Sequence, residues 1–285
     1  MKQMIRYVSS RCSSTKPLAT GHSRPSSIAI TLALALAATL PFGAWASEIV
    51  VPSGSIVTVQ DAVDAAQPGD TIRVLPGNYE SVFVATPGLK LLAETETGPV
   101  IVNDFLVMTE NVEIKGFEVS QGIALIDSTG GQLSNNSVSG GVGILVLDST
   151  GVKIDHNTVV AETGILVSSC SGVKVDHNKV DALSVGIAMD DCSGATVDHN
   201  RAIGLDSAGI EIFASSASRI EYNHAEGFHG IDVSGGGCGN AFEQNSAVGS
   251  EFGLYSDETP QATCNSYKKN KAATAFPSLK FWGAK

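Results

Sequence analysis

Residues 164–180 read Gly-Ile-Leu-Val-Ser-Ser-Cys-Ser-Gly-Val-Lys-Val-Asp-His-Asn-Lys-Val. Two features of this stretch, the Gly-Ile pair and the asparagine, recur along the chain. The asparagines are Asn136, Asn157, Asn178, Asn200, Asn223, Asn245 and Asn270, spaced 21, 21, 22, 23, 22 and 25 residues apart. The glycines, each followed by Ile or Leu, are Gly122, Gly143, Gly164, Gly186, Gly209, Gly230 and Gly253. Two features with one shared period of about 22 residues indicate a small structural unit that is stacked many times.

Within one unit, apolar and polar residues alternate over only three to six positions, and helical spacing is absent. This pattern predicts three short strands and three turns in each coil of an all-β, right-handed parallel β-helix. Leucine-rich repeats have a similar period, but their leucine pattern is missing. The length suits one domain of roughly ten coils.

Aligned coils predict columns of side chains. Apolar columns, expected to point inward, stand three residues before and two residues after each asparagine: Leu133, Ile154, Val175, Val197, Ile220, Phe242 and Tyr267, then Val138, Val159, Val180, Ala202, Ala225, Ala247 and Ala272. We expect the asparagine itself at a bend, where it tolerates a left-handed backbone and passes amide hydrogen bonds between coils. The glycine is expected where a side chain would crowd a turn.

Residues 1–46 have the composition of an export signal. Five bases and no acid precede an apolar run from Ile28 to Leu40, and Ala44-Trp45-Ala46 fits a cleavage site. We therefore predict a secreted or periplasmic protein cleaved after Ala46, without stable membrane insertion, because the apolar run is short for a bilayer span. Without the leader, 13 bases (18 − 5) face 29 acids, a net charge of −16. Such a charge argues against a nucleic-acid partner and would repel anionic polysaccharides unless a cation intervenes.

Residues 47–86 lack the repeat and are expected to form an N-terminal cap with the first coil. Residues 59–66 place Val59, Ala62, Val63 and Ala66 at helical spacing, which predicts a short helix over the open core. The stretch from Val59 to Glu80 resembles the opening of the pectin-lyase-like β-helix superfamily, and residues 87–275 resemble the repeats of NosD-like and alginate-epimerase-like proteins. Residues 276–285 are expected to be a C-terminal tail. The resemblance implies the fold, but its members include lyases, hydrolases, esterases, epimerases and non-catalytic proteins.

Four cysteines lie in residues 47–285. Cys238 and Cys264 occupy similar turn positions in the last two coils, so we predict a disulfide between them. Cys170 and Cys192 also stack in neighbouring coils, and the sequence leaves open whether they are bonded or are buried thiols.

The catalytic signatures that the resemblance suggests are incomplete. Residues 228–231, Phe-His-Gly-Ile, resemble one element of polygalacturonase-like sites, but Val185 and Ala208 stand where the acids belong. The Asp-Pro-His motif of alginate epimerases is absent. Whether the protein is an enzyme is left open; if it is one, a polysaccharide lyase, epimerase or hydrolase is expected.

The outward position after each Gly-Ile pair supplies the candidate catalytic residues. Glu211 and Asp232 are predicted to be adjacent carboxylates, with His229 on the strand of Asp232. Candidate carbohydrate-binding residues near them are Asp190, Phe213, Phe252 and Tyr255. Stacked carboxylates repel one another unless they share a proton or bind a cation. The alternative interpretation is an ordinary solvated acidic surface.

The outward position after each asparagine forms the one basic column, Lys179, Arg201 and His224. It could hold an acidic sugar, but a set of surface ion pairs that contribute little to stability is the favoured interpretation.

A third column repeats an Asp-His pair three times, and we name it the Asp-His ladder: Asp155, His156, Asp176, His177, Asp198 and His199. Imidazoles beside carboxylates are metal ligands, but a ladder holds them parallel instead of converging. We therefore expect no cofactor and no structural metal, with these six residues as the candidates should a divalent cation bind.

Two functions follow as hypotheses. The first is recognition or processing of a polysaccharide along the Gly-Ile strands. The alternative is a non-catalytic, NosD-like periplasmic module that handles metal or binds a protein. A polysaccharide or oligosaccharide is the expected partner, and the protein is expected to be a monomer.

Overall fold

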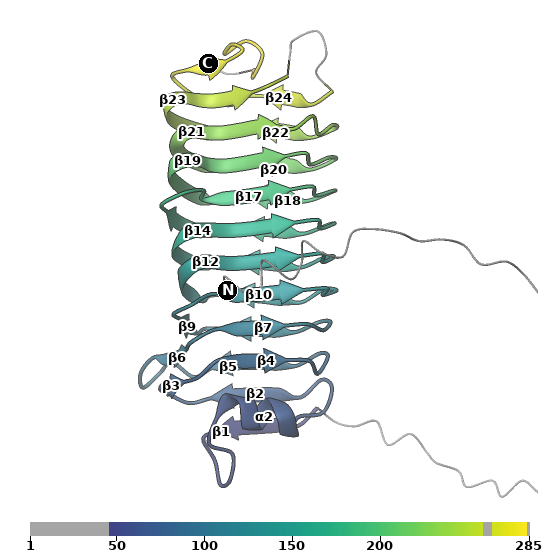
Figure 1. The fold of residues 1–285 in the computed structure, drawn as a ribbon, viewed down its shortest axis with the longest axis vertical. Helices are drawn as coiled ribbons and strands as arrows, with labels where there is room; N and C mark the ends of the chain where they lie inside the picture. The colour runs from purple at the N-terminus through teal and green to yellow at the C-terminus, as the bar shows by residue number, and fades with distance from the viewer. Residues whose placement is uncertain (1–45, 259–263, 284–285) are drawn as a thin grey trace, which may run out of the picture. The chain divides into compact units, whose positions relative to one another are not determined.

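The computed structural model describes residues 46–258 and 264–283, so the predicted export signal lies outside the described residues except for Ala46. The described chain winds into stacked coils whose strands pair in parallel with the coils before and after (Figure 1). This arrangement confirms the all-β solenoid that the repeat predicts. No helix in this part of the chain is both long and apolar enough to cross a bilayer.

The strands form two sheets that run the length of the solenoid. The first has 11 strands, one in each coil: β1 (Glu48–Val51), β2 (Thr71–Val74), β5 (Lys90–Ala93), β8 (Glu113–Lys115), β11 (Gln132–Ser134), β13 (Lys153–Asp155), β15 (Lys174–Asp176), β18 (Thr196–Asp198), β20 (Arg219–Glu221), β22 (Ala241–Glu243) and β24 (Ser266–Lys268). The second has 14: β3 (Gly77–Tyr79), β4 (Val82–Val84), β6 (Val100–Val102), β7 (Phe105–Val107), β9 (Glu118–Val119), β10 (Ile123–Ile126), β12 (Ser137–Leu147), β14 (Thr158–Ser168), β16 (Lys179–Ala182), β17 (Ile187–Asp190), β19 (Arg201–Phe213), β21 (His224–Ser234), β23 (Ser246–Ser256) and β25 (Ala275–Phe276).

The number of strands in each coil differs from the prediction. In β12, β14, β19, β21 and β23, the second and third expected strands join into one long strand. Of the six coils from β12 to β23, only that of β16 and β17 keeps the two strands separate. Small residues such as Gly140, Ala161, Gly204 and Gly227 stand where the long strands bend. Ala182 holds the same position in the interrupted coil, so a small residue alone does not join the two strands.

The asparagine column carries hydrogen bonds from coil to coil, as predicted. Asn157 donates from its backbone N–H and from Nδ2 to Oδ1 of Asn178, at 2.9 and 3.0 Å. Asn178 in turn donates to Oδ1 of Asn200, at 2.9 and 3.0 Å. The ladder continues in the same way through Asn223 and Asn245 to Asn270.

The left-handed backbone does not lie at these asparagines, and that part of the prediction is wrong. It lies at the residue before each one, with φ between 53° and 56° at His156, His177, His199, Tyr222 and Gln244. The asparagine side chain is thereby turned inward, where it satisfies buried backbone groups, while the preceding side chain projects from the corner.

The Gly-Ile column is crowded as expected. A Cβ atom on Gly143 would lie 2.8 Å from the carbonyl oxygen of Gly164 and closer still to Val159. The aliphatic residue after each glycine is fully buried, and it packs with both predicted inward columns into one continuous core.

The two ends of the core are covered. Helix α2 (Val59–Ala65) lies across the first coils (Figure 1), with Val59, Ala62 and Val63 buried beneath it. Thr58 caps this helix, because its hydroxyl accepts the N–H of Asp61 and its own N–H is bonded to the Asp61 carboxylate. At the other end Trp282 is fully buried against Phe242 and Tyr267.

The predicted disulfide joins Cys238 to Cys264, whose Cα atoms are 5.3 Å apart. Cys170 and Cys192 are buried free thiols, which resolves the alternative that the sequence left open.

Candidate active site

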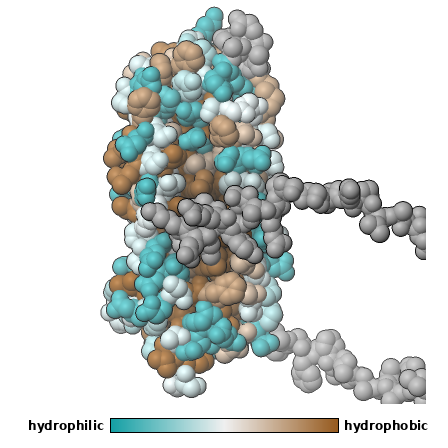
Figure 2. All heavy atoms as spheres, in the orientation of Figure 1, coloured by the Kyte–Doolittle hydropathy of each residue, from teal (hydrophilic) through white to brown (hydrophobic). Residues whose placement is uncertain are grey.

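The register of the second sheet aligns the residues that follow the Gly-Ile pairs, together with the equivalent residues of the first coils and of the last one, into one row. Its members, from the first coils to the last, are Phe83, Leu106, Ala124, Leu145, Leu166, Ala188, Glu211, Asp232, Tyr255 and Phe276. The row is apolar up to Ala188 and then becomes acidic and aromatic. On the face of the solenoid that Figure 2 shows, hydrophobic and hydrophilic residues are interspersed.

Glu211 and Asp232 are neighbours in this row, as the sequence predicts. Burial is the main cause that raises the pKa of the Glu211 carboxyl, and the negative charges of Asp232 and Asp190 raise it further. Asp190 lies on β17, opposite Phe213 instead of Glu211, so it is one coil and two positions away. Glu211 therefore holds its proton more tightly than an ordinary glutamate does.

His229 connects Asp232 to the next coil. Its Nδ1 lies 2.6 Å from Asp232 Oδ2, and its Nε2 lies 3.2 Å from Glu251 Oε2. The imidazole stacks on the ring of Tyr255, with centroids 4.4 Å apart and an interplanar angle of 10°. Only 13% of the His229 side chain is exposed, so its orientation is fixed by contacts on several sides.

Asp232 Oδ1, the oxygen that does not face His229, is buried and has no hydrogen-bond partner among the described residues. An unpaired carboxylate oxygen in a protein interior is costly unless another group satisfies it. This oxygen is therefore an unpaired acceptor inside the site, and it is closed to a ligand in the conformation that the structure shows.

The candidate sugar-binding aromatics divide into two kinds. Phe252 and Tyr255 pack against one another and against Phe276, with centroids 5.5 to 6.0 Å apart, so their faces are partly covered. Phe213, two residues beyond Glu211, is 44% exposed, and so is Phe228, whose ring lies 5.0 Å from His229. Phe213 and Phe228 are therefore more open to a sugar ring than Phe252 and Tyr255 are.

The corner lengths explain why His229 reaches its partners. Between the bend glycine and the Gly-Ile glycine, β21 has only Phe228 and His229, whereas β19 has residues 205–208 and β23 has residues 250–252. The register shifts at both boundaries, in the manner of a β-bulge. Glu251 stands in the longer corner, beside the histidine of the short one.

Glu251 and Phe228 were missed as site residues by the sequence analysis. The signal that could have found them is the number of residues between the bend residue and the Gly-Ile glycine. It is two in β12 and β14, three between Ala182 and Gly186, four in β19, two in β21 and three in β23.

The basic column is aligned as predicted, but it lies at the beginning of β16, β19 and β21, whereas Glu211 and Asp232 lie towards the far ends of β19 and β21. Its cations face surface carboxylates. Lys179 lies 3.8 Å from Asp181, and Arg201 and His224 lie 3.4 and 2.6 Å from Glu226. The structure does not bring these three bases to Glu211, and their pairing fits the interpretation as surface ion pairs.

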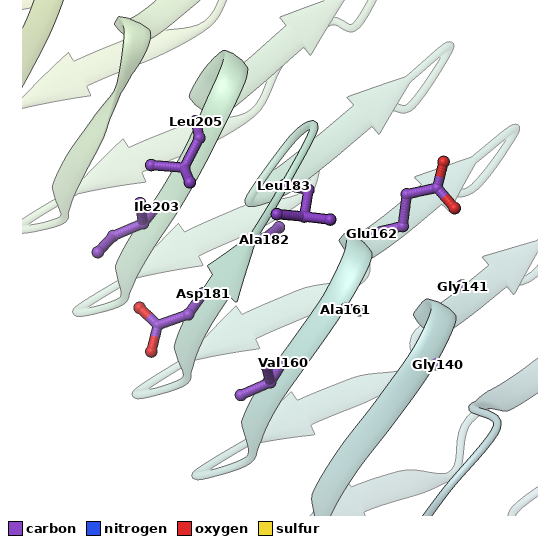
Figure 3. A pocket seen from close by; sticks show the side chains of 10 residues that line it. All are labelled: Gly140, Gly141, Val160, Ala161, Glu162, Asp181, Ala182, Leu183, Ile203 and Leu205. Atoms are coloured by element: carbon purple, nitrogen blue, oxygen red, sulfur yellow. The ribbon is translucent and has the colours of Figure 1, made fainter.

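Beside this column a shallow hollow of about 640 Å³ runs along the bends of β12, β14, β16 and β19 (Figure 3). Val160, Asp181 and Ile203 form one row on its floor, and Leu183 and Leu205 stand exposed at the bends. It lies around the corner from Glu211 and Asp232 and contains none of the predicted catalytic residues.

The Asp-His ladder lies at the corner that follows the first sheet. Rings of His156, His177 and His199 stack with centroids 5.0 Å apart and interplanar angles of 4° and 5°. Tyr222 continues the stack at 4.9 Å. The rings are parallel, as the sequence predicts, and candidate ligand atoms of Asp155, His156 and Asp176 lie within 4.8 Å of one another.

Comparisons with known proteins give a family and several distant structures. A family model described as "Right handed beta helix region" matches residues 100–247. Solved structures with similar coils include a double mutant of a periplasmic alginate epimerase (14% identity, TM-score 0.47, covering 79% of this chain and 66% of that chain). Others are a rhamnogalacturonan lyase (13%, 0.41, 79% and 80%) and a pectate lyase (14%, 0.37, 80% and 74%).

This chain thus spans just under two thirds of the epimerase. No curated protein sequence matches it significantly. The residues that the family model matches, 100–247, make up more than half of the 285 residues, and the chain therefore belongs to the right-handed β-helix family.

Proposed function

We propose that the protein binds a polysaccharide along the outward row of β17, β19, β21 and β23 and processes it with Glu211, Asp232 and His229. The observation that carries this proposal is the pair of adjacent carboxylates, one with a raised pKa and the other bonded to a nearly buried histidine. The row runs from coil to coil, so a polymer lying along it meets a new strand about every 4.8 Å.

The two carboxyl groups are suited to different roles. Glu211 retains its proton to a higher pH than usual and is the candidate general acid. Asp232 is oriented by His229 Nδ1 and is the candidate proton acceptor. A proton donor and a proton acceptor on neighbouring strands are the minimum set for acid–base chemistry at a glycosidic bond. Phe213 and Phe228 would stack on sugar rings beside this pair.

The charge of the chain narrows the substrate class. With a net charge of −16 after residue 46 (13 − 29), a neutral polysaccharide is favoured, and a polyuronate needs a cation between it and the row.

The test is a panel of neutral and uronate polysaccharides, the latter with and without calcium, assayed for binding, new reducing ends and unsaturated products. Glu211→Gln and Asp232→Asn should each lower binding or turnover at least about tenfold. Glu162→Gln and Asp181→Asn are matched controls, because these carboxylates line the hollow on the other side of the corner. Full activity in the double variant of Glu211 and Asp232 would place the site elsewhere.

We also propose that the protein is exported, on the basis of the residue pattern before Ser47 and the Cys238–Cys264 disulfide, which oxidising compartments favour. Amino-terminal sequencing of the protein recovered from a bacterial periplasm or culture medium should begin at Ser47. A chain that retains residues 1–46 and stays in the cytoplasm would contradict this.

A further inference from the structure

We propose that the Asp-His ladder is a reversible site for one divalent transition-metal ion, held by the Nε2 atoms of two neighbouring histidines. The ladder lies at a different corner from the acidic row, and the proposal does not depend on the polysaccharide.

The first argument is the orientation of the imidazoles. Nδ1 of His156 lies 3.2 Å from Asp155 Oδ2, Nδ1 of His177 lies 3.3 Å from Asp176 Oδ1, and Nδ1 of His199 lies 2.6 Å from Asp198 Oδ1. The first two pairs are hydrogen-bonded, whereas Asp198 Oδ1 is buried and has no hydrogen-bond partner among the described residues despite the short distance. A carboxylate that accepts the Nδ1 proton leaves the lone pair on Nε2, and this is the usual arrangement behind metal-binding histidines.

The second argument is that the Nε2 edges are free. Between 47% and 56% of each histidine side chain is exposed, and no hydrogen bond to Nε2 of these three residues occurs among the described residues. His156 and His177 therefore both present an Nε2 lone pair at the surface, and the ring of His199 continues their stack without a carboxylate hydrogen bond at Nδ1. The ladder ends at Tyr222, which continues the stack without a ligand nitrogen.

The carboxylate side of the ladder is a poorer place for the ion, although Asp155, His156 and Asp176 converge there. Lys153 Nζ lies 3.4 Å from Asp155 Oδ2, and Lys174 is in direct contact with Asp176. These carboxylates already have cationic partners, which a metal would have to displace. The outer edge has no such competition, so the ion is placed on Nε2.

The spacing of the rings determines the kind of ion and its affinity. Two nitrogens at about 2.0–2.1 Å from a tetrahedral ion are about 3.4 Å apart, whereas the ring centroids are 5.0 Å apart. Two half-exposed rings must tilt towards one another to bind, which costs part of the affinity. Imidazole ligands suit zinc, copper and nickel better than calcium or magnesium, and water would complete the coordination. The ion is therefore exchangeable and not a structural one.

The ladder makes an unusual prediction about its three histidines. His177 belongs to both neighbouring pairs, whereas His156 and His199 belong to one pair each and are separated by two ring spacings. Removing either end leaves one intact pair, but removing the centre leaves none. His177→Gln should therefore weaken binding at least about tenfold, and His156→Gln or His199→Gln should weaken it less, because each of these variants leaves one pair in place.

The experiment uses the full chain, stripped with EDTA and desalted. Calorimetric titrations with zinc, nickel and copper chlorides, with calcium chloride as the hard-ion control, give stoichiometry and affinity for the protein and each variant. His224→Gln is the matched control, because His224 has a similar exposure and also faces a carboxylate but lies outside the ladder. Electron paramagnetic resonance of the copper form counts the imidazole nitrogens, and circular dichroism confirms that each variant is folded.

Two nitrogens on copper, a tenfold or greater loss in His177→Gln and no change in His224→Gln would establish the site. Asp176→Asn should weaken binding about tenfold, because the carboxylate no longer fixes the tautomer of His177. The proposal is overturned by the absence of saturation up to about 1 mM metal, by a single coordinated nitrogen, or by unchanged binding in folded His177→Gln.

Discussion

The outward row of the second sheet has two halves that share a backbone and differ in chemistry. In the coils of β12, β14 and β17 the row exposes Leu145, Leu166 and Ala188, and in the coils of β19, β21 and β23 it exposes Glu211, Asp232 and Tyr255. One position behind the row, the inward side chains hardly change: they are Ile144, Ile165, Ile187, Ile210, Ile231 and Leu254, all fully buried.

Comparing the two halves shows which residue positions the repeat constrains and which it leaves free to vary. An inward residue must fill the core between two coils, so its size and polarity are constrained. An outward residue is constrained only by the neighbours in its row. The acidic half also departs from the repeat in its corners, since register shifts occur between Gly204 and Ala208 and between Gly227 and His229. The corners become irregular one coil earlier, at residues 183–185, and the candidate site lies in this irregular part of the solenoid.

The largest effect on stability should come from breaking the asparagine ladder, which runs through both halves of the solenoid. In Asn178→Ala, the backbone N–H and Nδ2 of Asn157 lose their acceptor, and the carbonyl oxygens of Ile154 and Asp176 lose a donor. Several buried polar groups are left unpaired, so the free energy of unfolding should fall by more than about 3 kcal/mol. Urea unfolding measures this. Asn135→Gly is the control, because Asn135 is exposed and left-handed and glycine tolerates that backbone; equal losses in both variants would contradict the ladder's role.

The second-largest effect on stability should be confined to one of the two halves. The Cys238–Cys264 disulfide lies at the acidic end, and replacing both cysteines by serine should cost about 3 kcal/mol. Amide hydrogen exchange should become faster in β22 and β24 and stay unchanged in β13. The same loss of protection in β13 would mean that the solenoid unfolds as one unit and that the two ends cannot be compared separately.

A smaller, pH-dependent effect should come from the acidic pair. The pKa of Glu211 is raised in the folded protein, so folding favours its protonated form and stability falls as the pH rises from about 4.5 through the folded pKa. Glu211→Gln removes this dependence and should be more stable than the parent protein at neutral pH, with the advantage vanishing below the ordinary pKa. Thermal melts from acid to neutral pH test this, with Glu162→Gln as the control. A variant less stable than the parent at neutral pH would show that Glu211 is satisfied by a contact that its charge strengthens.

The smallest effect is expected in the basic column, which lies outside both halves of the outward row. Arg201 lies 3.4 Å from Glu226 and is 45% exposed at its side chain, so Arg201→Gln should change the free energy of unfolding by less than about 0.5 kcal/mol. Polysaccharide binding should also be unchanged. A loss of binding comparable to that of Asp232→Asn would extend the site around the corner.

The fold could be predicted because its determinants repeat. A buried amide such as Asn178 must appear once in each coil, and a crowded glycine such as Gly164 must do the same, so both leave a period in the sequence. The backbone detail was harder to predict. Asparagine tolerates a left-handed conformation, but at this corner its side chain points inward. The residue before it, such as His156 or His177, adopts the left-handed conformation instead.

The candidate site was only partly predictable, for a related reason. The alignment of Glu211 with Asp232 follows from the period. The contact of His229 with Glu251 follows from the different lengths of two corners, and a period carries no information about such differences. The joining of the second and third strands was also not predictable from the period, because no single residue type marks where a hydrogen-bond ladder continues around a bend.

The asparagine ladder also constrains how such a protein can change in length. Each Oδ1 accepts from the coil before it, and each Nδ2 donates to the coil after it, as from Asn157 to Asn178 and from Asn178 to Asn200. A single inserted residue in this corner would interrupt the sequence of donors and acceptors. Removal of residues 158–178 would instead place Asn157 directly before Lys179 and let it donate to Asn200. Gene duplication or deletion of one whole repeat is thus a neutral step for the ladder, and the solenoid can evolve in units of a coil while the acidic row stays intact.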